Sequence, residues 1–311
     1  MNEIGIAAGL ATAVLWSATA LCFEVAARKV GSFNVNILRL LVAAVLFVGL
    51  SLWRTGHLGP HGLSSIAWRD LTLSGLIGFV VADMMLFRAF VLIGARLSML
   101  LYASVPAMTG FAGYVFLGER LTSMNILGMA ITSAGIGLAI FGKRSIQATT
   151  QSLSHKGILL AIGGSAGQTA GLLLGKRGAG TIDAFSATEV RVLAGLCGFC
   201  VVAIFARQLP SLSALFKMAV GLGRSGNEMT VRTTRTALVI LIIGGLLGPF
   251  LGVSLGLLST QLLAASIAST LMSLVPVLLI PISAIVFHER VTFLEVAGTV
   301  VALVGVALLT I

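Results

Sequence analysis

Charged residues are scarce in this sequence. Asp, Glu, Lys and Arg make up 10% of the 311 residues, whereas 58% are hydrophobic and the mean hydropathy is +1.08. Soluble domains carry about 25% charged residues. This shortage excludes an ordinary soluble fold and indicates that lipid is the main environment of the chain.

Acidic residues are rarer than basic ones, with 10 Asp and Glu against 20 Lys and Arg. A net charge of +10 would suggest nucleic acid as a partner of a soluble protein. Here the basic residues lie in short breaks between apolar runs, which is typical of membrane edges, so we expect no nucleic-acid partner.

Histidine and cysteine are also few. The 4 histidines fall in loops or at the ends of apolar runs and form no H-E-x-x-H zinc motif. Cys197 and Cys200 have C-x-x-C spacing but lie inside an apolar run, where thiols behave as small hydrophobic groups. We therefore expect no metal, no cofactor and no enzymatic activity.

Long apolar runs are abundant instead. A bilayer core about 30 Å thick is crossed by roughly 20 helical residues. Ten runs of about this length predict an all-α, polytopic membrane protein with a basic loop at 206–236. The predicted spans are 4–27, 35–53, 71–93, 97–117, 124–141, 157–175, 185–205, 237–258, 262–287 and 293–311.

The two halves of the chain match each other at a spacing of 170 residues. Gly75 corresponds to Gly245, and Pro106 corresponds to Pro276. Five helices are therefore duplicated, and because five is odd, the second copy must enter the membrane from the opposite side. We expect a first repeat at 1–142, a linker at 143–156 and a second repeat at 157–311.

Each copy also carries the motif Glu-Arg-x-Thr at the end of its fourth span. The motif contains Glu119 and Arg120 in the first copy and Glu289 and Arg290 in the second. We interpret it as the point where a span leaves the hydrocarbon, with the following Thr capping the next helix and Thr292 in capping-box spacing to Glu295. A gating role is the alternative.

Two five-helix copies, each with a central Val-Pro followed by Glu-Arg-x-Thr, resemble the EamA-type members of the drug/metabolite transporter superfamily. The family pattern has Gly before Glu, which is kept at Gly118 and replaced by His288 in the second copy. The resemblance implies a multi-pass permease of the cell (inner or plasma) membrane, often an exporter of amino acids or related compounds, with cytoplasmic termini. The distribution of Lys and Arg favours termini outside, so the orientation stays open.

Charged residues inside the spans are the main site candidates. Asp83 lies near the centre of the third span, where a carboxylate costs about 2.5–3.5 kcal/mol, so it should face a cavity or a partner. Arg88, near the end of that span, is either a site residue or an anchor at the membrane edge. Arg39 and Arg191 occupy matching places in the two copies and are either such anchors or binders of an anionic group.

Other polar and helix-breaking residues are weaker candidates. Glu24 and Glu189 lie near helix ends, and hydrogen bonds or an aromatic wall are available from Gln168, Trp16 and Tyr102. Prolines inside spans free backbone groups for a ligand or a gate, which makes candidates of Pro106, Pro249 and Pro276.

An acid and bases converging on one cavity suit a zwitterion such as an amino acid, and a buried carboxylate is also suited to carry a coupling proton. We therefore predict a transporter of small metabolites that works by alternating access between the repeats, as a monomer or homodimer in contact with membrane lipid. A non-transporting membrane sensor or assembly protein is the alternative, which the inverted duplication disfavours.

Overall fold

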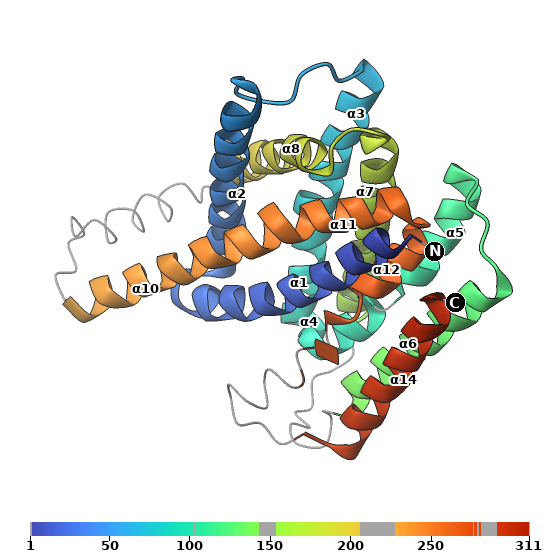
Figure 1. Ribbon diagram of the computed structural model, residues 1–311. Coiled ribbons are helices and arrows are strands. Elements are labelled where there is room, and N and C mark those ends of the chain that lie inside the picture. Colours follow the sequence, from blue (N-terminus) through green and yellow to red (C-terminus); the bar gives the residue numbers. More distant parts are fainter. Residues whose placement is uncertain are drawn as a thin grey trace.

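Every regular element in the described part of the chain is a helix (Figure 1). This computed structural model describes residues 2–102, 104–142, 154–205, 228–275, 277–278, 280 and 291–310. The first half contains α1 (Glu3–Val30), α2 (Ser32–Thr55), α3 (Ser65–Gly75), the π-helix η1 (Leu76–Ala82), α4 (Asp83–Tyr102), α5 (Val105–Leu117) and α6 (Ser123–Gly142). The second half contains α7 (His155–Ala179), α8 (Ala184–Phe205), α10 (Glu228–Gly245), the π-helix η3 (Leu246–Gly252), α11 (Val253–Leu262), α12 (Ala265–Met272) and α14 (Phe293–Thr310).

Nine of the ten predicted spans correspond to apolar helices. Among the described residues, seven helical segments are long and apolar enough to cross a bilayer, and α5 and α14 are shorter apolar helices. The remaining span, predicted at 262–287, is represented by α12, and residues 281–290 lie outside the described part. The prediction of an all-α, multi-pass membrane protein is confirmed.

The predicted loop at 206–236 is wrong at its end. α10 begins at Glu228, so residues 228–236 are helical, and residues 206–227 lie outside the described part. The segment EMTVRTTRT contains no Gly or Pro to stop a helix. A hydropathy window recognises only the lipid-crossing part of a helix and misses such a polar extension.

Two further boundaries differ from the prediction. Helical backbone continues through residues 94–96 of α4, where we expected a break between the third and fourth spans. In the second copy the break predicted at 259–261 occurs instead at 263–264, where Leu263 is extended with φ −123° and ψ 166° between α11 and α12. The corresponding helices of the two repeats are therefore not identical.

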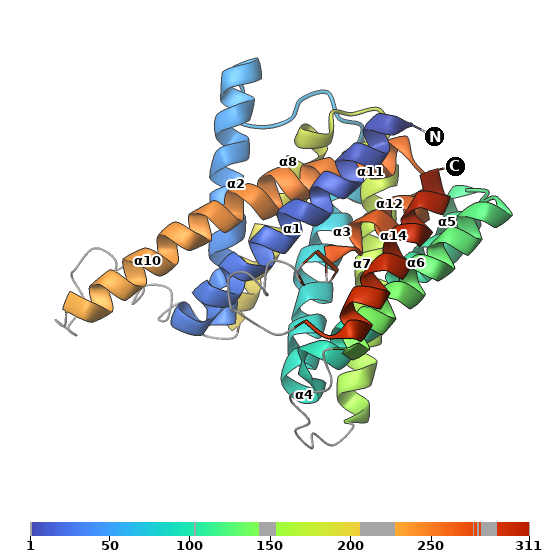
Figure 2. The same ribbon diagram turned by 60° about the horizontal axis from the view of Figure 1, so that its bottom comes forward.

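The last helices of the two repeats show that the repeats are inverted. α6 and α14 lie side by side in both views (Figures 1 and 2), with glycines at their contacts. A Cβ at Gly128 would lie 2.9 Å from the carbonyl oxygen of Gly305, and a Cβ at Gly135 would lie 2.8 Å from that of Gly298. Since the contact order reverses along the chain, these two helices are antiparallel, as inverted copies require.

The first helix of each repeat packs along the third helix of the other repeat. On α7, a Cβ at Gly171 would lie 2.9 Å from Gly78 Cα, and one at Gly178 would lie 3.0 Å from Asp70 Cβ. The carbonyl of Gly5 on α1 accepts a hydrogen bond of 2.8 Å from Ser259 of α11. Glycines spaced four apart, at 163, 167, 171 and 175 on α7 and at 244, 248, 252 and 256 from α10 to α11, therefore serve close helix packing.

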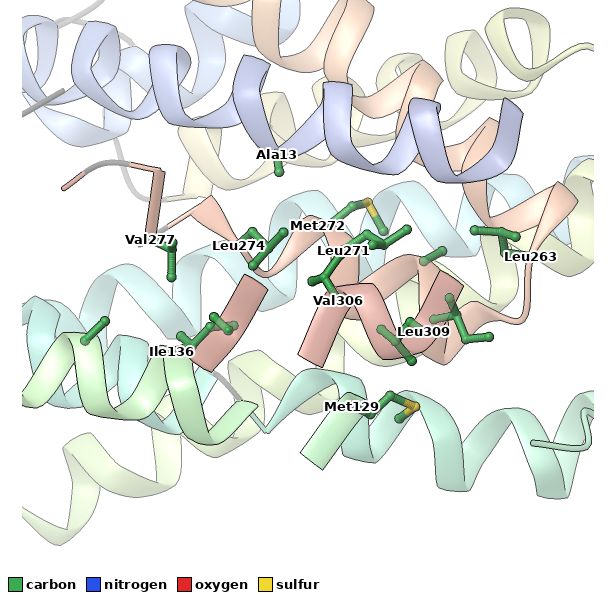
Figure 3. Close-up of a cluster of buried hydrophobic side chains, with 14 residues drawn as sticks. Ala13, Met129, Ile136, Leu263, Leu271, Met272, Leu274, Val277, Val306 and Leu309 are labelled. Carbon is green, nitrogen blue, oxygen red and sulfur yellow. The ribbon is translucent and has the colours of Figure 1, made fainter. Parts of the chain in front are cut away.

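A buried apolar cluster joins the two repeats (Figure 3). Leu271 of α12 and Leu309 of α14 are fully buried, and Ile136 of α6 is 1% exposed. Ala13 of α1 contributes from the other side. Because the members come from both halves, the halves are held together by interdigitated side chains as well as by glycine contacts.

The α6–α14 contact predicts a stability effect. In Gly135→Ala, the added Cβ would lie 2.3 Å from the backbone nitrogen of Ala302 and force the two helices apart. We expect a loss of about 1–3 kcal/mol of stability, measured as a lower melting temperature in detergent. The matched control is Gly49→Ala on α2, where nothing lies within 4 Å and stability should hold or rise. Equal melting temperatures for the two variants would contradict the close contact.

Candidate functional site

Asp83 lies at a junction of three helices from both repeats. Arg39 of α2 donates a hydrogen bond to Asp83 Oδ2 and forms an ion pair with it. From the second repeat, Gln168 Nε2 of α7 donates to Asp83 Oδ1 at 3.3 Å. Three candidates that the sequence proposed separately therefore meet, and we call Asp83, Arg39 and Gln168 the Asp83 cluster.

The local backbone explains why these side chains reach one another. Asp83 follows directly after η1, and π-helical turns are common at functional sites. Gln168 can reach Asp83 because α7 approaches η1 closely where Gly171 faces Gly78. Arg39 lies over the ring of Phe23, with its guanidinium carbon 5.6 Å from the ring centroid.

The Asp83 cluster is nearly enclosed. The side chains of Arg39 and Asp83 are 14% and 12% exposed, so some of their surface stays accessible. Breaking a buried ion pair by removing one partner costs about 3–5 kcal/mol because it leaves an uncompensated charge. The cluster is thus suited to a ligand that brings its own charges of both signs.

Tyr102 lies at the opposite end of α4 from Asp83, because α4 begins at Asp83 and ends at Tyr102. Its neighbour Leu101 packs against the cluster of Ala89, Ile93 and Ala161. No hydrogen bond among the described residues joins Tyr102 to Asp83, so Tyr102 is not counted in the Asp83 cluster.

Arg191 is the repeat mate of Arg39 but has a different environment. Its guanidinium carbon lies 5.6 Å from the centroid of the Phe79 ring, and its Nε has no hydrogen-bond partner. Where the first copy has Asp83, the second has Val253. Among the described ion pairs none contains Arg191, so the structure does not join it to the Asp83 cluster.

The remaining candidates lie outside the Asp83 cluster. Trp16 of α1 packs on η3, where a Cβ at Gly252 would lie 2.7 Å from the indole Nε1. Arg88 is exposed on α4. The side chain of Glu24 and all of Pro276 are outside the described residues.

Two prolines mark helix irregularities. Pro249 lies inside η3, the π-helix that corresponds to η1 at the spacing of 170 residues. Pro106 lies in the first turn of α5, where a missing backbone N–H is tolerated. Both repeats therefore have a π-helical turn at the equivalent position of the sequence, although only the second contains a proline there.

Glu119 has a role that the sequence did not predict. Its two carboxylate oxygens accept hydrogen bonds from the backbone N–H of Ala265 at 3.0 and 2.9 Å, at the start of α12. Lys176 Nζ lies 2.6 Å from Glu119 Oε1 and also donates to the carbonyl of Leu263 at 2.6 Å. The motif of the first repeat thus caps the broken helix of the second repeat.

The rest of the motif behaves partly as expected. Gly118 adopts the left-handed conformation with φ 65° and ends α5, whereas Arg120 is exposed. Thr292 and Glu295 form the predicted capping box, with hydrogen bonds of 2.7 and 3.3 Å. Glu289 and Arg290 lie outside the described residues.

Further polar contacts join the repeats at the face that contains Glu119. The C-terminal ends of α2 and α7 and the N-terminal ends of α3 and α8 lie at this face. Asp70, whose side chain is fully buried, accepts hydrogen bonds from Arg177 at 2.6 and 3.0 Å. Arg54 Nη1 donates to Asp183 Oδ2 at 3.1 Å. Each pair takes one partner from each half, so ion pairs link the halves at this face.

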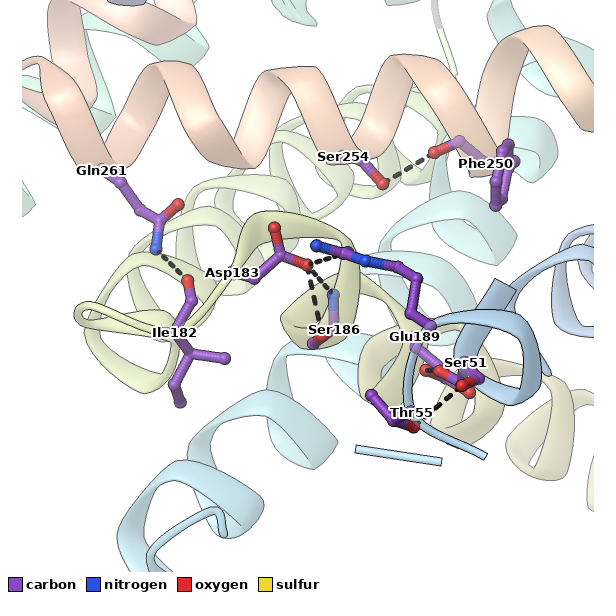
Figure 4. Close-up of polar contacts among 10 residues, drawn as sticks. Ser51, Thr55, Ile182, Asp183, Ser186, Glu189, Phe250, Ser254 and Gln261 are labelled. Atoms are coloured by element: carbon purple, nitrogen blue, oxygen red, sulfur yellow. Dashed lines mark hydrogen bonds and ion pairs between the residues drawn. The ribbon is translucent and has the colours of Figure 1, made fainter. Parts of the chain in front are cut away.

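A cavity of about 270 Å³ lies between the end of α2 and the start of α8 at the same face. Its lining includes Phe47, Ser51, Arg54 and Glu189. Ser51 donates a hydrogen bond to Glu189 Oε2 (Figure 4). The signal for this cavity in the sequence is weak, namely a glutamate near a helix end.

The comparisons with known proteins agree with this architecture. The model of the EamA-like transporter family matches residues 3–141 and 155–311, so the chain belongs to that family. It is therefore a membrane transporter of the drug/metabolite type. One solved structure, described only as a crystal structure of a protein, has a TM-score of 0.73 and 17% identity, over 100% of this chain and 97% of its own, which shows the fold alone. Among curated proteins no match was found.

Proposed function

We propose that this transporter moves a small zwitterionic metabolite, such as an amino acid or a related compound, across the cell membrane by alternating access. The observation that carries the proposal is the Asp83 cluster, where a carboxylate, a guanidinium and an amide from both repeats meet at a nearly enclosed place. An ammonium group is complementary to Asp83, and a carboxylate is complementary to Arg39.

The architecture supports movement around this cluster. The inverted repeats contact each other through antiparallel helices, and inverted repeats are suited to exposing a central site to either side in turn. At the face with the Glu119 contacts, ion pairs between the repeats oppose opening. We infer that these contacts break when the site opens to that face, with export as the proposed direction and Asp83 as the carrier of a coupling proton.

Flux through the purified protein tests this proposal. Proteoliposomes loaded with a panel of radiolabelled amino acids and related zwitterions should release at least one of them faster than protein-free liposomes loaded in the same way. An imposed proton gradient should change that rate. The control is the Glu3→Gln variant, whose change lies at the exposed start of α1. Saturable binding of a zwitterion without any flux would support the sensor alternative and contradict transport.

A further inference from the structure

The cavity between α2 and α8 is formed by one helix from each repeat. Phe47 and Phe185 form part of its wall with their ring centroids 6.5 Å apart, and Leu50 adds apolar surface. At the exposed side, Arg54 and Asp183 form their ion pair. The cavity therefore combines an apolar wall with charged groups at its mouth.

Glu189 places a carboxylate in this cavity. The residue is 1% exposed, and its Oε2 accepts the hydrogen bond of Ser51. Its Oε1 accepts no hydrogen bond from any described residue. A buried carboxylate without a full set of donors is costly, and most buried polar groups in proteins are paired.

No described cationic side chain pairs with Glu189. Arg54 also lines the cavity, but its ion pair is with Asp183 at 3.1 Å. Arg191 follows two residues later on α8, and residues two apart on a helix do not face each other. The chemistry that complements Glu189 Oε1 is therefore a positively charged hydrogen-bond donor.

We propose that this cavity binds the ammonium group of a small primary amine, with Glu189 Oε1 as the acceptor. The volume of about 270 Å³ corresponds to roughly nine water molecules, which suits an amine with a short alkyl chain. Phe47 and Phe185, which line the cavity, add aromatic surface to its apolar wall. The alkyl chain would lie against Leu50.

This site is separate from the Asp83 cluster. Counted along the helices, Glu189 lies about 8 Å from the start of α8, whereas Asp83 lies about 27 Å from the start of α3 at the same face. The proposal therefore does not depend on the transport proposal. An amine bound near Glu189 would occupy a position at the membrane face rather than at the centre.

Calorimetric titration of the purified protein in lipid nanodiscs with n-butylammonium chloride tests the proposal. We expect saturable binding to the wild-type protein and an affinity lower by about tenfold to hundredfold for Glu189→Gln, which keeps the size and one acceptor of the side chain. The neutral analogue 1-butanol should not bind. The control variant Glu3→Gln, changed at the exposed start of α1, should bind n-butylammonium as the wild-type protein does.

A second variant covers the case in which Glu189→Gln does not fold. Leu50→Trp fills the cavity and leaves the carboxylate in place, so it should lower the affinity at least as much as Glu189→Gln does. Equal affinity of wild-type protein and Glu189→Gln would overturn the proposal, as would binding of 1-butanol with the affinity of the amine. Loss of binding in Asp83→Asn with full binding in Glu189→Gln would assign the amine to the Asp83 cluster instead.

Discussion

The Asp83→Asn variant is expected to lose zwitterion transport in proteoliposomes by about a hundredfold or more. Asparagine has nearly the same shape but cannot neutralise Arg39, which would remain 14% exposed without its ion pair. Leaving one partner of a buried pair uncompensated costs about 3–5 kcal/mol, and each 1.4 kcal/mol corresponds to a tenfold change. The measurement is the initial rate of flux per reconstituted protein.

A double variant separates binding from folding. Asp83→Asn combined with Arg39→Gln removes both charges, so the fold should recover much of its stability while transport stays lost. Melting temperatures report on the fold, and flux reports on the site. If the double variant regained transport, the Arg39–Asp83 pair would be structural only, and the assignment of the substrate to this cluster would be wrong.

The second large effect is expected at Glu119. In Glu119→Gln, Lys176 loses its ionic partner and α12 loses the negative charge at its start. We expect the repeats to separate more readily at this face. Labelling of a cysteine introduced at the buried Ser266 of α12, in a protein without its native cysteines, should become about tenfold faster with a membrane-impermeant thiol reagent.

The neighbouring motif residue provides the control for this experiment. Arg120 is exposed, so Arg120→Gln should leave the labelling rate unchanged. Removing both charges in Glu119→Gln with Lys176→Met should give a rate between those of the wild-type protein and the single variant, because no unpaired ammonium remains. Similar rates for Glu119→Gln and Arg120→Gln would show that the Glu119 contact does not hold this face closed.

The sequence predicted the individual members of the Asp83 cluster but not the hydrogen bonds that join Arg39 and Gln168 to Asp83. A carboxylate at the centre of an apolar run is costly alone, which identified Asp83, and the matching positions of the two copies identified Arg39. Gln168 was one of several ordinary polar residues. Its contact with Asp83 depends on the close approach of α7 to η1, which involves Gly78 and Gly171.

The hydrogen bonds of Glu119 to Ala265 and Lys176 could not be predicted either, because they also join residues far apart in the sequence. Ala265 lies 146 residues away in the sequence, and the predicted break at 259–261 does not indicate which group caps the helix that follows it. The motif could be recognised as a helix end from its position alone. Its hydrogen bond to the other repeat arises only once the antiparallel halves are packed together.

The order of amino acids by itself determined the membrane class, most of the spans and the inverted duplication, because hydropathy and repeat spacing are properties of the linear chain. Tertiary structure decided which charges pair across the halves, which carboxylate caps α12, and that Glu189 lies in a cavity. Those outcomes depend on side chains brought together from helices far apart in the chain, and local patterns contain no information about such distances.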